Sequence, residues 1–203
     1  MSKKPLIIFE GIEGSGKSHH ISKVSKYLIK NNKKFIKIRE PGGNKNSEKI
    51  RNLILNNKST FNKNTDLLLY LSARSENIEL IKTNYGKKII LIDRFVDSTI
   101  AYQHYGMGVD IKFIKMVNDF LLKDINIDFT FLNLVNSKNM RERLLKRKKL
   151  NRYDQFNTSF YKKVQEGFIN ISKKNPKKYM KIDSNLDIKD NENIIINKIK
   201  EII

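Results

Sequence analysis

The sequence predicts an α/β fold, a parallel sheet with helices on both faces. Short apolar runs rich in β-branched residues alternate with segments of helical periodicity, and a glycine-rich turn follows the first run. No internal repeat or low-complexity linker interrupts the 203 residues. Because strands that alternate with helices pair in parallel, with helices as the crossovers, we expect one three-layer domain over residues 1–203.

Five short apolar runs predict the strands of this sheet. The clearest is Lys-Ile-Ile-Leu-Ile at 88–92, which is followed directly by Asp93 and Arg94. Such runs, bounded by charge or turn residues, are typical of buried strands. The predicted strands are residues 5–9, 35–38, 88–92, 128–135 and 179–182.

Segments with apolar residues at helical spacing lie between and after these runs. They predict helices at residues 19–30, 48–55, 66–81, 113–122, 139–149, 160–174 and 194–203. The stretch 146–157 is nearly all polar and begins with four consecutive basic residues. We therefore expect a mobile lid at about residues 143–157.

Composition excludes several classes of protein. The chain has no cysteine and 3 histidines, which excludes disulfide scaffolds and thiolate metal sites. No apolar stretch approaches the length of a transmembrane helix, and the first residues lack the pattern of a signal peptide. We expect a cytoplasmic protein with no membrane partner.

The net charge of +20, from 41 Lys and Arg against 21 Asp and Glu, first suggests nucleic-acid binding. Lysine, asparagine and isoleucine are, however, abundant along the whole chain, whereas a binding surface more often shows clustered arginine with interleaved aromatic residues. We expect no nucleic-acid partner, although composition alone does not decide whether the lysines share one face.

A complete phosphate-binding motif follows the first predicted strand. It fits G-x-x-x-x-G-K-[ST], with a strand before it and a helix after it. Lys17 is expected to reach the β- and γ-phosphates of ATP, while the Ser18 hydroxyl and Asp93 hold Mg²⁺. The predicted ATP-binding residues of the motif are Gly11, Ile12, Glu13, Gly14, Ser15, Gly16, Lys17 and Ser18.

Further motifs follow in order: Arg-Glu-Pro-Gly-Gly at 39–43, Ala-Arg at 73–74, and Asp-Arg-Phe-x-x-Ser-x-x-Ala-Tyr-Gln at 93–103. With the glycine-rich loop, they resemble the thymidylate kinase family over residues 5–185. The resemblance implies a nucleoside monophosphate kinase fold that transfers phosphate from ATP to dTMP, giving dTDP for dTTP synthesis. It also implies Mg²⁺ as cofactor and a homodimer.

On the acceptor side, the resemblance makes Arg39 a clamp on the dTMP phosphate and Arg94 a second clamp. A guanidinium suits this role because its fork matches phosphate oxygens. Tyr70 resembles the ring that stacks on thymine, and Arg74, one turn later, the donor to thymine O4. Tyr70 read without the family is more simply a core residue.

The same resemblance extends to the sugar and the base edge. Ser98 and Thr99 are expected to address N3 of the base, and Gln103 belongs to the same set of dTMP contacts. Tyr102 resembles the residue packed under the deoxyribose, where it leaves no room for a 2′-hydroxyl. Glu13 matches the acidic residue that accepts from the 3′-hydroxyl.

The basic segment 143–155 resembles the bacterial arrangement in which the lid carries the catalytic arginines. Arg147 and Arg152 are the candidates for the triphosphate, and Arg143 resembles the arginine beside adenine. Lys17, Arg94, Arg147 and Arg152 are thus the expected catalytic cations. Asn151 stands where the family usually has Asp, so the supporting ion pair is in doubt. A solvated basic helix is the alternative reading.

Two other functions compete with this hypothesis. A deoxynucleoside kinase shares an Asp-Arg motif but would phosphorylate thymidine and would not need Arg39 as a clamp. A nucleic-acid-binding ATPase would show salt-dependent binding and hydrolysis stimulated by nucleic acid.

Overall fold

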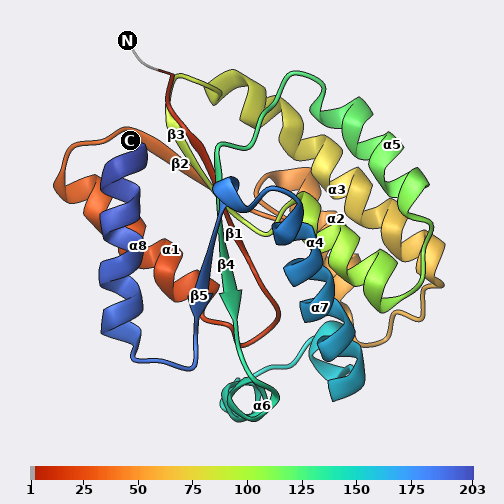
Figure 1. The fold of residues 1–203 in the computed structure, drawn as a ribbon. Helices are drawn as coiled ribbons and strands as arrows, with labels where there is room; N and C mark the ends of the chain where they lie inside the picture. The colour runs from red at the N-terminus through yellow and green to blue at the C-terminus, as the bar shows by residue number, and fades with distance from the viewer. Residues whose placement is uncertain (1–2) are drawn as a thin grey trace.

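The computed structural model describes residues 3–203, and within them the predicted alternation of strands and helices is confirmed (Figure 1). The strands are β1 Leu6–Glu10, β2 Phe35–Arg39, β3 Ile89–Asp93, β4 Phe129–Leu134 and β5 Tyr179–Asp183. The α-helices are α1 Lys17–Lys30, α2 Lys45–Leu55, α3 Lys63–Asn84, α4 Val96–Thr99, α5 Ile111–Leu122, α6 Ser137–Leu145, α7 Thr158–Lys174 and α8 Ile188–Ile202. A π-helix, η1 Ile100–Gly106, continues α4, and η2 Arg152–Gln155 and η3 Pro176–Lys178 are 3₁₀ turns.

The five strands form one parallel sheet in the order β2-β3-β1-β4-β5. In register, Arg39 at the end of β2 lies beside Asp93 at the end of β3, and Phe9 of β1 is the next partner of Asp93. Because all strands run the same way, their polar carboxyl ends meet at one edge, where ligands of open α/β sheets bind.

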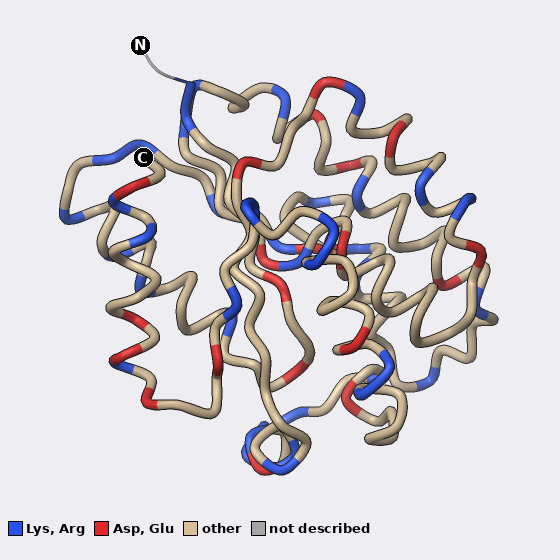
Figure 2. The backbone as a smooth tube through the Cα atoms, in the orientation of Figure 1, with Lys and Arg blue, Asp and Glu red and all other residues tan. Residues whose placement is uncertain are grey.

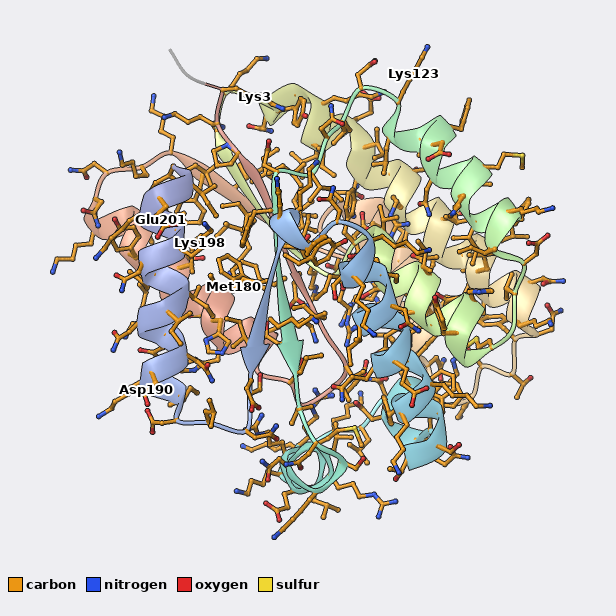
Figure 3. All side chains as sticks on the ribbon, viewed as in Figure 1. Lys3, Lys123, Met180, Asp190, Lys198 and Glu201 are labelled. Carbon is orange, nitrogen blue, oxygen red and sulfur yellow. The ribbon has the colours of Figure 1, made fainter. Side chains whose placement is uncertain are left out.

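Alternate residues of β1 pack into different layers, as expected of a strand buried on both faces. Ile7 and Phe9 join the cluster under α1 and α8, whereas Leu6 and Ile8 join the cluster under α3. Figure 1 shows α1 and α8 on one side of the sheet and α3, α4, α5 and α7 on the other. Met180 of β5 points into the layer beneath α8 (Figure 3).

An asparagine side chain caps the N-terminus of four of the α-helices. The side chains of Asn44, Asn62, Asn136 and Asn157 accept hydrogen bonds from main-chain N–H groups in the first turns of α2, α3, α6 and α7. Asparagine is among the best N-cap residues because its side-chain oxygen satisfies N–H groups that lack a partner in the helix. Part of the high asparagine content therefore has a structural use.

Several predicted helix boundaries differ from the observed ones by two or three residues, and two differ by more. The helix expected at 139–149 ends at Leu145, before the consecutive basic residues, whose like charges disfavour a further turn. The last helix begins at Ile188 instead of residue 194, because the Asp187 side chain accepts hydrogen bonds from Lys189 N and Asp190 N and caps it there.

Lys and Arg are spread over the helices on both sides of the sheet and over α6 (Figure 2). The described part of the chain holds no helix that combines the length and the low polarity needed to cross a membrane. The structure thus shows the excess positive charge distributed over many elements.

Candidate active site

The P-loop, residues 11–18, leads from β1 into α1 at the carboxyl edge of the sheet. Gly11, Gly14 and Gly16 have φ of 138°, 69° and 85°, a region that favours glycine. A Cβ on Gly11 would lie 2.3 Å from the carbonyl oxygen of Asn133 in β4. Glycine is therefore required both by the curl of the loop and by its close approach to the sheet.

Lys17 is buried with its amine folded onto the loop. Its Nζ donates to Gly11 O at 2.8 Å, Ile12 O at 2.9 Å and Ser15 Oγ at 3.3 Å. Burial, reinforced by the positive charge of Arg94, lowers the pKa of Lys17 to about 7. The amine contacts only neutral acceptors, so an anion in the loop would favour its charged form.

Ser18 and Asp93 meet at the mouth of the P-loop. The Ser18 hydroxyl donates to Asp93 Oδ2 at 3.1 Å. Residues 3–203 contain no group of three or more His, Cys, Asp or Glu side chains with the arrangement of a metal site. A hydroxyl and one carboxylate nevertheless fit Mg²⁺, which keeps several waters and takes further ligands from phosphates.

Arg94 adopts a left-handed backbone, φ 65°, directly after β3. This conformation is rare for a residue with a Cβ. Its guanidinium donates to Gly11 O at 2.8 Å and to Glu13 Oε1 at 2.8 Å. Burial opposes the charge of Arg94, but the Glu13 carboxylate raises the pKa of Arg94 well above its usual value. The pair fixes a permanent cation against the P-loop.

Glu13 also binds Tyr102 of η1, whose hydroxyl donates to Glu13 Oε2. Although burial opposes ionisation, Arg94 and Lys17 lower the pKa of Glu13. The Tyr102 ring in turn lies under the Arg94 guanidinium, 5.1 Å from centroid to Cζ. The π-helix thus brings together the residues expected at the sugar, and such helices recur at functional sites.

Arg51, which was not among the residues predicted from the sequence, lies beside Arg39. Arg39 is half exposed and bonded to both oxygens of Glu48 in α2, at 3.0 and 2.9 Å. Arg51, one turn later on α2, donates to Pro41 O at 2.7 Å. Arg51 lies three residues after Glu48, so both are on one face of α2 just after the Arg-Glu-Pro-Gly-Gly turn. That spacing could have identified Arg51 from the sequence.

These groups surround one cavity of about 190 Å³, which opens between the P-loop, α2, α3 and the predicted lid segment 143–157. It brings together cations predicted for the donor, the acceptor and the lid. Its lining includes Glu13, Lys17, Ser18, Arg39, Arg51, Tyr70, Asp93, Arg94, Arg147, Asn151 and Tyr153.

A smaller pocket of about 20 Å³ continues towards η1. Tyr70 lines both cavities and meets the Tyr153 ring edge-on, with centroids 5.8 Å apart. Ser98 and Gln103 also line this pocket. Gln103 Oε1 is buried and accepts no hydrogen bond in this structure, so this oxygen lacks a donor.

Arg74 and Thr99 lie behind this pocket and do not line it. Arg74 is 1 % exposed, and its Nε donates to Glu40 Oε2 at 2.8 Å. Its two terminal nitrogens donate to Asn118 Oδ1 at 2.7 Å and Thr99 Oγ1 at 2.9 Å. The contact of Arg74 with thymine O4 stays a prediction, and so does that of Thr99 with N3.

Glu10, the last residue of β1, was not selected either. It is fully buried and accepts from Phe95 N at 2.7 Å, Ser98 N at 3.2 Å and Ser98 Oγ at 2.5 Å. Burial raises the pKa of Glu10. Because α4 has no side-chain cap of its own, Glu10 takes that role and fastens α4 to the strand before the P-loop.

The segment 143–157, predicted to be a lid, folds around Asp154. Asn151 caps η2 and forms a capping box with Asp154, and Arg147 donates to Asp154 Oδ1 at 2.5 Å. Asn151 therefore replaces the usual Asp as a helix cap, and Asp154 supplies an ion pair within the lid. Arg147 is the one of the two candidate catalytic arginines that lines the larger cavity.

Arg152 points away from that cavity. Its Nε donates to Ile54 O at 3.0 Å, and its terminal nitrogen is ion-paired with the buried carboxylate of Asp66. The structure thus separates Arg147 and Arg152, which the sequence analysis assigned to one task.

Arg143 lies on the opposite side of the P-loop. It donates to Gly14 O at 2.9 Å and Ser184 O at 2.6 Å. Together with Ser15, Gly16, Ser184 and Leu186 it lines a separate pocket of about 200 Å³. His20 is buried there, and burial together with neighbouring His19 lowers its pKa to about 4, so it is neutral.

Comparisons with known proteins agree with this geometry. The family model described as thymidylate kinase matches residues 9–195. A thymidylate kinase of Thermoanaerobacter sp. is 34 % identical over 202 residues, with 98 % of each chain covered. A thymidylate kinase of Staphylococcus epidermidis is 36 % identical over 182 residues, with 88 % of this chain and 89 % of the relative covered. The crystal structure of thymidylate kinase from Ehrlichia chaffeensis matches with a TM-score of 0.78 and 32 % identity, covering 98 % of this chain and 99 % of the other. The family model and these relatives show that the chain belongs to the thymidylate kinase family.

Proposed function

We propose that this protein transfers the γ-phosphoryl group of ATP to dTMP, giving ADP and dTDP. The observation that carries the proposal is that one cavity is lined by the P-loop lysine and by four arginines outside the loop, which are Arg39, Arg51, Arg94 and Arg147. A donor triphosphate and an acceptor monophosphate repel each other, so both must be surrounded by cations before they can react.

Positioning and charge supply the catalysis. The acceptor phosphate oxygen is already an anionic nucleophile, so no general base is required. Lys17 would hold the β- and γ-phosphates, Arg94 would lie between donor and acceptor, and Arg147 would reach the transferred group from the lid. Arg39 and Arg51 would fix the dTMP phosphate for in-line attack.

The nucleoside of dTMP would occupy the side of the cavity nearest α3 and η1. Tyr70 offers its ring for stacking, and Ser98 and Gln103 offer polar atoms to the base edge. Glu13 and Tyr102, which are hydrogen-bonded to each other, would contact the sugar and leave no space for a 2′-hydroxyl. Arg74 and Thr99 complete the wall behind the base.

The donor would follow the P-loop, residues 11–18, with adenine in the pocket beside Arg143. Ser18 and Asp93 would hold Mg²⁺, which when bound neutralises charge on the β- and γ-phosphates. The chain's own residues set where the phosphates lie, because both pockets open onto the same loop.

A coupled assay of ADP release tests the proposal with dTMP, dUMP, dCMP, AMP, GMP and thymidine as acceptors. We expect dTMP to give the highest kcat/KM. Turnover of thymidine in preference to dTMP would instead identify a nucleoside kinase, and equal rates with all monophosphates would contradict the assignment to dTMP.

We further propose a homodimer that packs through α5 and α3. Phe113, Met116 and Phe120 lie on one face of α5 and are 39 %, 60 % and 80 % exposed, and Leu68 of α3 is 51 % exposed. α3 and α5 lie side by side (Figure 1). Phe120→Asp should shift the mass measured by light scattering from dimer to monomer, whereas Ile29→Asp on α1, also at an exposed apolar residue, should not.

A further inference from the structure

A buried carboxylate joins the lid to the helix that carries the thymine platform. Asp66 is fully buried in the first turns of α3, one helical turn before Tyr70. It receives the guanidinium of Arg152 and the hydroxyl of Tyr153 from the lid, and Gln103 Nε2 of η1 at 3.2 Å. The lid and η1 thus meet on one side chain of α3.

Arg152 is held on every side in this position. Besides the ion pair with Asp66, it donates to the last turn of α2 through Ile54 O and lies 5.6 Å from the Phe61 ring. Its side chain is 13 % exposed. Unlike Arg94, Arg152 does not line the reaction cavity, and moving it to a phosphate there would leave the buried Asp66 carboxylate without its cation.

Arg147 has the opposite surroundings. Its side chain is 40 % exposed, it lines the reaction cavity, and its partner Asp154 belongs to the lid itself. Arg147 can therefore travel with the lid without breaking a contact to the rest of the molecule. The lid offers one cation to the cavity and uses the other to attach itself.

We propose that Asp66 is a positioning residue that docks the lid onto α3 through Arg152 and Tyr153, so that Arg152 anchors the lid while Arg147 faces the transferred phosphoryl group. The proposal rests on the proposed phosphoryl transfer for its kinetic consequences. Because Tyr153 also touches Tyr70 and Tyr102, docking ties the position of the lid to the walls of the acceptor pocket.

The first test compares Asp66→Asn, Asp66→Glu and the double variant Asp66→Asn/Arg152→Gln. If Asp66 docks the lid, Asp66→Asn lowers kcat/KM for dTMP by about 10- to 100-fold, the cost of misplacing a catalytic group by roughly 1 Å. Arg152→Gln alone and the double variant should show the same loss, because all three break one contact. Asp66→Glu, which keeps the charge, should recover part of the activity. Asp124→Asn, the same change on an exposed turn, is the matched control.

The opposite result is equally clear. If Arg152→Gln costs far more than Asp66→Asn, and the two losses multiply, Arg152 acts on the phosphates and the anchoring role is overturned.

A second test does not depend on activity. The exposed residues Lys146, Lys148 and Lys149 are trypsin sites in the lid, so loss of docking should speed cleavage there, as mapped by mass spectrometry. Unchanged cleavage in a folded Asp66→Asn protein would overturn the proposal, even if the wild type proved inactive on dTMP. Should Asp66→Asn not fold, Tyr153→Phe removes only the hydroxyl that donates to Asp66 and must show the same faster cleavage.

Discussion

Lys17 in the P-loop and Arg74 in α3 are both buried cations, but they have different partners. Lys17 is 7 % exposed and donates to two carbonyl oxygens and a hydroxyl. Arg74 is 1 % exposed and is paired with the buried carboxylate of Glu40. The Lys17 amine therefore lacks the directly bonded carboxylate that Arg74 has.

This difference indicates where substrate charge is needed. A buried amine among neutral acceptors has a lowered pKa, and a phosphate would restore its charged form. Arg74 already has a buried carboxylate partner, and the Arg74–Glu40 pair holds α3 against the turn after β2. Variants in the two regions should therefore separate stability from activity.

The largest expected effect is on stability, in the α3 region. Arg74→Met leaves Glu40 buried without its cation, which should lower the free energy of unfolding by about 3–5 kcal/mol. Urea unfolding measures it, with Arg141→Met on exposed α6 as the control, expected to cost less than about 1 kcal/mol. The double variant Arg74→Met/Glu40→Gln should recover part of the lost free energy of unfolding. If Arg74→Met and Arg141→Met unfolded with the same free energy, the buried Arg74–Glu40 pair would not stabilise α3 as proposed.

The next effect is on catalysis, in the P-loop. Lys17→Met should lower kcat by about 10²–10³-fold, the usual cost of one charge-stabilising donor, with the midpoint of thermal unfolding unchanged or raised. Stability is spared because the partners of the amine are neutral atoms of the loop. A strong loss of stability without loss of kcat would assign Lys17 a purely structural role.

Arg39→Ala should act mainly on the acceptor. Loss of one charge-assisted contact to phosphate should raise the KM for dTMP by about 10- to 100-fold while the KM for ATP changes little. Initial-rate kinetics measure both constants. Glu48→Gln, which weakens the hold on Arg39 without removing it, is the matched control and should change the KM for dTMP only slightly. A parallel rise in both KM values would contradict a role confined to the acceptor.

The smallest effect concerns pH. Burial is the main cause that raises the pKa of Asp97 to about 7, and the nearby Glu10 charge adds to it. The Asp97 carboxylate accepts a hydrogen bond from the Tyr179 hydroxyl at 2.8 Å. The folded protein then binds a proton that the unfolded chain has released, so this stabilisation is present below pH 4 and is lost as pH rises towards about 7.

Asp97→Asn should remove this dependence. The melting temperature of the variant minus that of the wild type should be larger at pH 8 than at pH 5. The increase should be roughly 2–4 °C for each kcal/mol of stability regained. Scanning calorimetry at the two pH values measures the shift. A constant difference between the variant and the wild type would show that Asp97 does not titrate in this range.

Much of the site could be predicted because motifs lie where strands end. Arg39 and Asp93 end β2 and β3, the P-loop follows β1, and parallel pairing brings those strand ends together. Arg51 and Glu10 were missed because their roles depend on the turn of α2 and the capping of α4. The separation of Arg147 from Arg152 was missed because Asp66 lies more than eighty residues earlier in the chain.

The sequence by itself determined the α/β fold, through its alternation of apolar runs and helical periods, and the phosphate-binding loop, through glycines at fixed spacing. Those features are local, since a strand, a turn and a helix each depend on neighbouring residues. The tertiary structure decided which cations keep a free face towards the cavity and which are neutralised behind it. Lys17 and Arg147 are in the first group and Arg74 and Arg152 in the second. Only folding brings a distant carboxylate within contact, and the energy of a buried charge depends on that partner.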